Sequence, residues 1–415
     1  MAERLLVYMQ GQVVGTLEQD PLTFAYTAPV VEEQAGAILI SAALKVRQGP
    51  FSERELRPFF EGLLPEGLAR QRLATRFRLD YADVFGLLRE IGRDCAGAIS
   101  IMPEDLAPSE RAAGGVVWLD DEQLAEAVDQ LDNLPLGVRP DRGVRLSLAG
   151  VQDKLVVMVD TRSGAIGLPR GTTPSTHILK PAPKERYPGL VLNEAFCMVL
   201  AAEAGLETAG VRLIEVGAEP ALLVERFDRR RLGEGVERIH QEDFCQALRV
   251  PFDRKYQFEG GPDLRRMVDF LNRTSTDAAA DIERLLLWEA FNFLIGNSDG
   301  HAKNVSILYS DRHGLAPAYD LVCTEMFGLA QELGQAIGDE YLPRLIRASH
   351  WLRELDHLGL NRRRLGGALA DFGVRVEAAM PRAEAWLRGQ GHWNDSLELV
   401  GQLVRERHPV LAELG

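Results

Sequence analysis

The sequence predicts an α+β protein with a mixed N-terminal domain, a β-rich region that contains one helix, and a mainly helical C-terminal half. Three observations support this fold class. Residues 5–15 alternate apolar and polar side chains around a Gly11-Gln12 turn, as a β-hairpin does. Residues 51–77 and 81–91 repeat apolar side chains at helical spacing. Beyond Glu242 helical patterns predominate, and residues 281–295 form an apolar helix that must be buried.

The elements divide the chain into four predicted segments. Residues 1–102 form the N-terminal α+β domain, and the acidic, Pro- and Gly-punctuated residues 103–142 form a connector with one helix around 124–131. Residues 143–240 form a β-rich region, and residues 241–415 a helical lobe. In the β-rich region we expect strands at 144–148, 155–159, 176–179, 211–216 and 221–224, with a helix at 193–204 that Gly205 ends.

Composition limits the classes of partner. Asp and Glu number 61 against 47 Lys and Arg, so the net charge of -14 opposes binding to a nucleic-acid backbone by the chain alone. The arginine runs at 229–231 and 362–364 are interpreted as solvated faces, and DNA is expected only through a partner. The four cysteines form no CxxC pair, and the longest apolar stretch is too short for a membrane span. We therefore expect a cytoplasmic protein.

A polar loop after the buried helix carries the chemistry. It runs from Gly296 to Asn304, and an apolar strand follows at 305–309. The Asp299-to-Asn304 spacing is that of the protein-kinase catalytic loop, in which the aspartate accepts the substrate hydroxyl proton and the asparagine binds a metal ion. Asp320, beyond a turn at 311–314, lies where a second metal-binding carboxylate is expected. A single aspartate is more often a cap, but the joint pattern favours phosphoryl transfer.

The upstream region offers residues for a nucleotide. Lys180 ends the strand at 176–179 and is expected to hold phosphates, while Glu194 either pairs with Lys180 or simply favours a helix N-terminus. The loop at 147–154 lies between two strands, where its backbone N–H groups could line an anion site. A Ser298/His301/Asp299 hydrolase triad is disfavoured because adjacent residues rarely converge on one substrate atom.

These blocks together resemble the HipA kinases, the toxin halves of bacterial HipA/HipB toxin-antitoxin modules. The resemblance covers most of the chain. The matching residues are Gly62 to Pro65, Glu90 to Asp94, Ser147 to Lys154, Ser175 to Lys180, Val224 to Arg229, Gln241 to Gln246, Gly260 to Pro262 and Gly296 to Asn304.

The resemblance implies a two-lobed kinase fold with an added N-terminal α+β domain and a helical C-terminal lobe. It implies ATP and Mg²⁺ as cofactors, Asp299 as the catalytic base, Asn304 and Asp320 as metal ligands, and Ser147 as an autophosphorylation site whose modification expels the phosphate loop. The implied ATP contacts are Leu148, Ala149, Gly150, Val151, Gln152, Asp153, Lys154, Lys180, Glu225, Arg226, Phe227, His301 and Lys303.

The resemblance also implies partners. The family phosphorylates aminoacyl-tRNA synthetases, glutamyl-tRNA synthetase among them, which arrests growth and produces persistence. It binds a small helix-turn-helix antitoxin, HipB, that represses the operon. Two alternatives stay open: a kinase-shaped co-repressor that acts through a DNA-binding antitoxin, and a small-molecule phosphotransferase that uses the same Asp/Asn/Asp chemistry.

Overall fold

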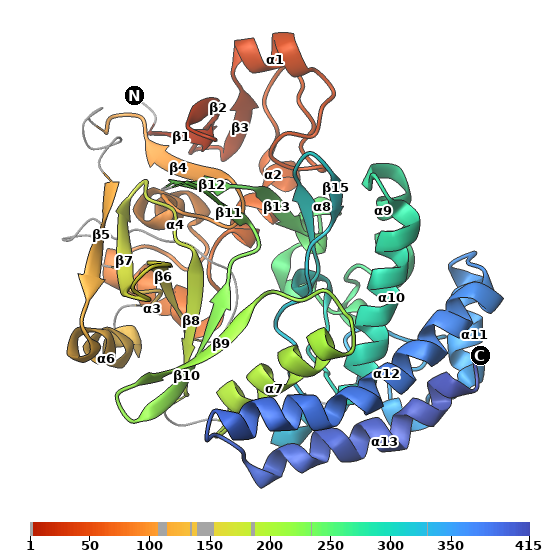
Figure 1. The fold of residues 1–415 in the computed structure, drawn as a ribbon. Helices are drawn as coiled ribbons and strands as arrows, with labels where there is room; N and C mark the ends of the chain where they lie inside the picture. The colour runs from red at the N-terminus through yellow and green to blue at the C-terminus, as the bar shows by residue number, and fades with distance from the viewer. Residues whose placement is uncertain are drawn as a thin grey trace. The chain divides into compact units, whose positions relative to one another are not determined.

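The computed structural model describes residues 3–106, 114–132, 135–138, 153–183, 187–233, 235–329 and 331–415. The chain forms two compact units, one of residues 1–181, 214–253 and 308–310 and the other of residues 182–213, 254–307 and 311–415 (Figure 1). Strands predominate in the first unit and helices in the second, which confirms the predicted α+β class. Over the described part of the chain, no helix has the length and apolar character that crossing a bilayer requires.

The first unit begins with an antiparallel sheet of order β3-β2-β1-β4. Its strands and the accompanying helices are β1 (Arg4–Met9), β2 (Gln12–Glu18), β3 (Thr23–Tyr26), α1 (Ala28–Gln34), α2 (Glu53–Gly62), α3 (Gly67–Phe77), α4 (Val84–Ile91) and β4 (Ile99–Pro103). The predicted hairpin is confirmed, with its turn one residue earlier than expected, at Gln10-Gly11. Both turn residues have positive φ, 49° and 81°, as a type I′ turn requires.

A six-stranded sheet of order β5-β7-β6-β8-β10-β9 follows. Its strands are β5 (Gly114–Leu119), β6 (Leu155–Val159), β7 (Ile166–Gly171), β8 (His177–Pro181), β9 (Val211–Val216) and β10 (Glu219–Glu225). The strands predicted at 155–159, 176–179, 211–216 and 221–224 are confirmed, and the one predicted at 144–148 lies outside the described residues. The connector supplies the helix α6 (Asp121–Asp129), which was predicted, and the edge strand β5, which was not.

The first unit is completed by short elements. These are the 3₁₀ turn η1 (Gln130–Asp132), the hairpin strands β11 (Arg229–Leu232) and β12 (Gly235–Arg238), then β13 (His240–Asp243) and α8 (Phe244–Ala247). Within β13, the buried Glu242 carboxylate accepts hydrogen bonds from the Ser41 hydroxyl at 2.6 Å, the Ala42 N–H at 2.8 Å and the Tyr309 hydroxyl at 2.5 Å. One side chain thus holds three segments that are distant in sequence.

Helices make up most of the second unit, and α7, α12 and α13 lie side by side (Figure 1). The helices are α7 (Leu190–Glu203), α9 (Leu264–Thr274), α10 (Ala278–Ile295), α11 (Ala348–His357), α12 (Arg362–Gly389) and α13 (Glu398–Ala412). The strands β14 (Ser306–Tyr309) and β15 (His313–Leu315) form a hairpin. Short 3₁₀ turns are η3 (Phe252–Arg254), η4 (Gln257–Glu259), η5 (Ala302–Asn304), η6 (Thr324–Phe327), η7 (Pro343–Leu345) and η8 (Asp395–Leu397). The helix predicted at 193–204 is confirmed as α7.

Helix α10 is buried, as predicted. The Asp277 side chain caps it by accepting the Ala280 N–H, and its residues are buried almost all round. It packs against α9, α12 and α13. Gly296 ends it with φ of +70°, a left-handed conformation in which a residue with a Cβ is strained. A rigid, buried helix therefore fixes where the next loop begins.

Candidate active site

The start of the polar loop is tied to α10 and to the η6 turn. The Asn297 N–H donates to the Asn292 carbonyl at 2.9 Å, and the Asn297 amide donates to the Asn292 side chain at 3.0 Å. The Thr324 hydroxyl donates to the Gly296 carbonyl at 2.9 Å and accepts the Ser298 N–H at 2.7 Å. Because these groups are buried or half-buried, each bond restrains the loop more than it would in water.

Asp299 stands at the exposed tip of this restrained loop. Its N–H donates to the Asn297 side chain at 3.0 Å, and 48% of its own side chain is exposed. The neighbouring Ser298 hydroxyl lies 2.8 Å from the Thr324 hydroxyl, with which it forms a hydrogen bond. That pairing agrees with the rejection of a serine triad. The loop presents a carboxylate, not a hydroxyl, to an incoming molecule.

Asn304 lies next to Asp299, as the spacing predicted, and His301 lies there as well. The Asp299 carbonyl accepts both the His301 N–H and the Asn304 side-chain amide, each at 2.9 Å. The His301 Nε2 lies 3.6 Å from the Asp299 Oδ1. Because the Asn304 amide nitrogen donates to this carbonyl, its oxygen is directed elsewhere and can bind a cation.

The Asp320 segment is anchored to the same loop. The hydroxyl of Tyr319 donates to the carbonyl of Lys303 at 2.7 Å and lies 2.8 Å from the Ser306 hydroxyl. Asp320 itself has φ of +58°, a region that aspartate tolerates better than most residues. Mg²⁺ is usually held by one or two protein oxygen groups together with phosphates and water. Asn304 and Asp320 offer groups of this kind, and their role as metal ligands stays a prediction.

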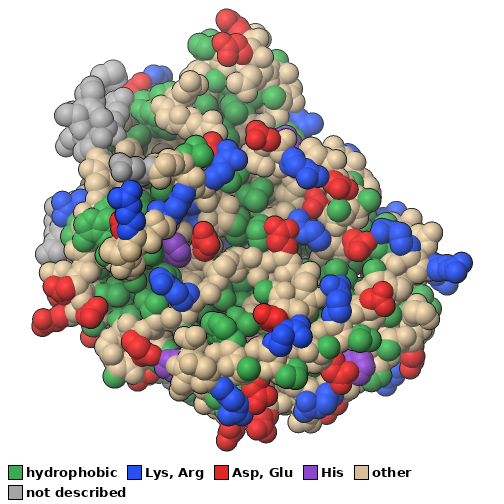
Figure 2. All heavy atoms as spheres, viewed as in Figure 1, with side chains coloured by type: hydrophobic (Ala, Val, Ile, Leu, Met, Phe, Trp, Pro, Cys, Tyr) green, Lys and Arg blue, Asp and Glu red, His purple; other side chains and the backbone are tan. Residues whose placement is uncertain are grey.

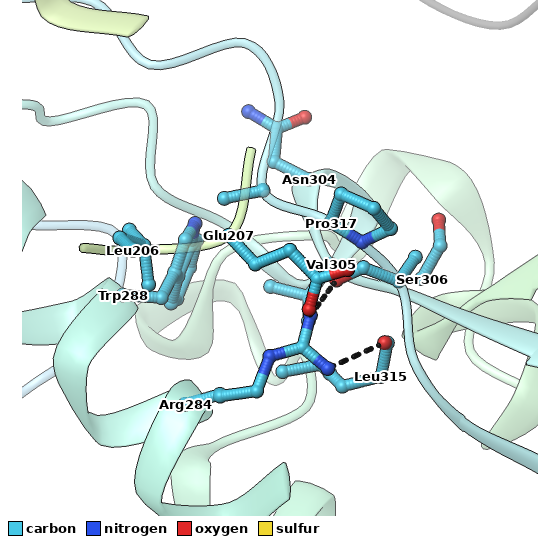
Figure 3. A pocket seen from close by; sticks show the side chains of 11 residues that line it. Leu206, Glu207, Arg284, Trp288, Asn304, Val305, Ser306, Leu315 and Pro317 are labelled. Carbon is cyan, nitrogen blue, oxygen red and sulfur yellow. Dashed lines mark hydrogen bonds and ion pairs between the residues drawn. The ribbon is translucent and has the colours of Figure 1, made fainter. Parts of the chain in front are cut away.

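A pocket lies behind the loop in the second unit (Figure 3). It is lined by Leu206, Glu207, Arg284, Trp288, Asn304, Val305, Ser306, Leu315, Ala316, Pro317 and Ala318. Arg284 pairs with Glu207 at 2.8 Å and donates to the Leu315 carbonyl at 3.0 Å. In Figure 3 the amide of Asn304 points away from Arg284 and Trp288, so this pocket is not on the side where Asn304 would bind a metal.

The first unit holds the other predicted nucleotide contacts. Lys180 is buried in β8, opposite Leu222 of β10. Asp153 pairs with Arg72 at 3.6 Å, and Lys154 is buried just before β6. The predicted phosphate-loop residues Leu148 to Gln152 and the predicted autophosphorylation site Ser147 lie outside the described residues. That these groups share one ATP with His301 and Lys303 stays a prediction.

Arg226, one of the predicted ATP contacts, belongs to a buried ion-pair network. Its guanidinium contacts Asp228 at 2.7 Å and donates to the Ser175 hydroxyl at 2.8 Å, and the backbone N–H of Arg226 donates to the Thr176 carbonyl at 3.0 Å. Arg229 pairs with Asp94 at 3.0 Å in the same network. The prediction of a solvated face is therefore wrong for Arg229, because two buried acids surround it. Adenine contacts by Glu225, Arg226 and Phe227 stay a prediction.

The charges in this network set the pKa values of its acids. Burial alone would raise the pKa of Asp94, but the guanidiniums of Arg229, Arg226 and Arg238 outweigh burial and hold it well below its usual range. In the same way Arg226 and Arg229 lower the pKa of Asp228 to about 2. Both acids are therefore ionised at neutral pH.

Sequence reasoning missed two residues that contact the loop. Thr324 bonds Gly296 and Ser298, and the Tyr256 hydroxyl donates to the Asp299 Oδ1. Neither belongs to a periodic pattern. Tyr256 does stand just before Gly260-Gly261-Pro262, a block that the family resemblance included, and this proximity was the available signal.

An exposed aspartate on a restrained loop, bonded to an asparagine five residues further on and joined to a second carboxylate segment, is the catalytic arrangement of protein kinases. Fold and loop together define the class as a kinase-like phosphotransferase.

Comparison with known proteins identifies the family. Residues 5–102 match the HipA N-terminal domain, and residues 146–380 match the HipA-like C-terminal domain. A putative kinase of Sinorhizobium fredii, Y4mE, is 41% identical over 364 residues, which are 85% of each chain. The serine/threonine-protein kinase toxin HipA of Shewanella oneidensis is 34% identical over 348 residues, which are 80% of this chain and 78% of that one.

A solved structure gives the same answer for the fold. The complex of Shewanella oneidensis HipA with HipB and its operator DNA contains a chain with a TM-score of 0.81 and 28% identity; the match covers 99% of this chain and 96% of that chain. The present chain belongs to the HipA family and is a serine/threonine protein kinase. The predicted resemblance and the kinase-like fold with an added N-terminal α+β domain are thereby confirmed.

Proposed function

We propose that this kinase transfers the γ-phosphoryl group of ATP to a serine or threonine hydroxyl of a protein, with Asp299 as the base. One observation carries the proposal: Asp299 is half-exposed, and its own backbone N–H and carbonyl are both hydrogen-bonded within the loop. A fixed carboxylate can accept the hydroxyl proton as the oxygen attacks phosphorus, and positioning supplies much of the rate in phosphoryl transfer.

The remaining groups would bind the nucleotide and its metal. Asn304 and Asp320 are the proposed ligands of Mg²⁺, which would neutralise charge on the phosphate oxygens when bound. Lys180 is the proposed ligand of the α and β phosphates, with further contacts from Leu148 to Lys154, His301 and Lys303. The donor set supports this assignment because hard oxygen ligands suit Mg²⁺ and buried lysines suit phosphate.

The proposed substrate is an aminoacyl-tRNA synthetase such as glutamyl-tRNA synthetase, and the proposed regulatory site is Ser147. Both rest on the family. A phosphate on Ser147 would add about -2 charges beside the nucleotide phosphates, so repulsion would drive the loop out and weaken ATP binding. Equal ATP affinity of the unmodified and the Ser147-phosphorylated chain would count against this switch.

The proposed partner is a small helix-turn-helix antitoxin of the HipB type, which would bring the kinase to DNA in the cytoplasm. The similarity to a HipA chain that was solved with HipB and operator DNA supports it. So does the formal charge of -14, which makes direct DNA binding by this chain unfavourable.

The test is incubation of the purified chain with γ-labelled ATP and Mg²⁺, wild type beside Asp299→Asn, with the labelled residue mapped by mass spectrometry. We expect label on Ser147 in the wild type alone, while ATP binding survives the substitution. Equal labelling of both proteins would overturn Asp299 as the base, and no labelling of either, despite ATP binding, would overturn the kinase proposal.

A second candidate, a co-repressor that works without phosphoryl transfer, is favoured by the operator DNA in the related complex. Asp320→Ala separates the two. Under our proposal the substitution abolishes growth arrest in cells that express the chain and leaves operator repression intact; growth arrest that persists would favour the co-repressor.

A further inference from the structure

The contacts that the Asp299 carboxylate makes within the described part of the chain involve one of its two oxygens, Oδ1. Over the described residues, its carboxylate contacts are the Tyr256 hydroxyl, which donates to Oδ1, and the His301 Nε2, 3.6 Å from the same oxygen. Both contacts fall on one oxygen of the two. Oδ2 is therefore the atom left to receive a substrate hydroxyl.

Tyr256 is itself fixed in place. Its carbonyl accepts the Gly261 N–H at 2.9 Å, and a Cβ on Gly261 would lie 2.6 Å from that carbonyl, so the close turn depends on glycine. Its ring stacks on Phe258 at 5.2 Å and meets the His301 ring edge-on at 5.1 Å. A ring packed against two neighbouring rings loses little further entropy when its hydroxyl forms a hydrogen bond.

We propose that Tyr256 is a positioning residue for Asp299: its hydroxyl anchors Oδ1 and so turns Oδ2 toward the phosphoacceptor hydroxyl. This inference rests on the proposed kinase function and deepens it. A hydrogen bond to a charged carboxylate is worth more than one between neutral groups, and a carboxylate that rotates freely spends less time in the reactive geometry. Removing the hydroxyl should slow phosphoryl transfer without weakening ATP binding.

Tyr256→Phe is the direct test, because phenylalanine keeps both ring contacts and removes only the hydroxyl. Tyr341→Phe is the matched control: Tyr341 packs edge-on against Phe258, at 6.1 Å, on the same aromatic cluster and has no contact with Asp299. Label transfer from γ-labelled ATP, into the chain itself and into casein as a generic acceptor, is followed against ATP concentration for each variant.

We expect Tyr256→Phe to lower the maximal rate about tenfold, with the half-saturating ATP concentration changed less than about twofold. Tyr341→Phe should match the wild type in both quantities.

Three results would overturn the inference while the kinase proposal stood. The first is a label-transfer rate of Tyr256→Phe equal to that of the wild type. The second is a lower rate that Tyr341→Phe shows as well, together with a lower melting temperature. The third is a rate of Tyr256→Phe above that of the wild type, which would make the contact inhibitory. A wild type that binds ATP and labels neither acceptor would overturn the kinase proposal itself, and this inference with it.

Discussion

Arg226 and Arg230 are close in sequence, but one is buried and the other is exposed to solvent. The Arg226 side chain is 2% exposed and bonded to two acids, whereas Arg230 is half exposed and pairs with Glu237 at the surface. Removing one partner of a buried pair leaves the other charge uncompensated. We expect Arg226→Ala to lower the free energy of unfolding by about 3–5 kcal/mol, and Arg230→Ala by less than about 1 kcal/mol.

Urea denaturation of both variants measures this difference. An equal decrease in the free energy of unfolding for both variants would contradict the assignment of Arg226 to a structural network. Its side chain would then be available for the predicted contact with ATP.

Glu242 gives a residue-scale prediction about pH. Burial raises its pKa to about 7 in the folded chain, against an ordinary 4.5, although three donors oppose the rise. A raised carboxyl pKa stabilises the fold fully below pH 4.5, and this contribution is lost as pH rises toward about 7. Glu242→Gln cannot ionise, so relative to the wild type it should gain up to about 3 kcal/mol between pH 4.5 and pH 7.5.

Denaturation of the two proteins across that pH range gives the difference directly. Glutamine can keep all three contacts if the Ser41 hydroxyl turns from donor to acceptor, so the variant should fold. A difference that does not change with pH would mean that Glu242 is ionised throughout.

At the level of elements, the junction of α10 with the polar loop at 296–304 depends on Gly296. A Cβ there would lie 2.7 Å from the Glu325 carboxylate, in addition to the strain at φ of +70°. Gly359 isolates the second effect, because its φ is +68° and its Cβ would meet open space. We expect Gly359→Ala to cost about 1 kcal/mol with full activity, and Gly296→Ala to cost more and to lower the label-transfer rate at least tenfold.

Thermal melting of both variants measures the loss of stability, and label transfer from γ-labelled ATP measures the loss of rate. If Gly296→Ala lost stability and kept its rate, the end of α10 would not set the position of Asp299.

The elements also show what the sequence could predict. Helix α10 was predictable because its residues are apolar on every face, and the loop because Asp299 and Asn304 are close in sequence. Strand β5 was missed because it is half-exposed at a sheet edge and alternates weakly. The Tyr256 contact joins residues 43 positions apart, and no local pattern encodes such a pairing.

At the scale of the whole molecule, acidic side chains outnumber basic ones, 61 to 47. On the face drawn in Figure 2, Lys and Arg side chains alternate with Asp and Glu, and neither sign gathers into a continuous patch. In the run at 362–364, Arg362 pairs with Asp356, and Arg364 with Glu283 at 2.5 Å. A cation already paired with a carboxylate releases little counterion when it meets a phosphate.

We therefore expect the chain alone to bind operator DNA no more tightly than about 10 μM at about 0.15 M salt, and to bind it at lower concentrations only together with the proposed HipB-type antitoxin. Fluorescence anisotropy of a labelled operator duplex measures both, with Arg362→Ala/Arg364→Ala as the matched variant, which should behave as the wild type does. Submicromolar binding by the chain alone, lost in that variant and steeply weakened by salt, would show that these arginines exchange their acidic partners for phosphates and that net charge does not decide how this kinase reaches DNA.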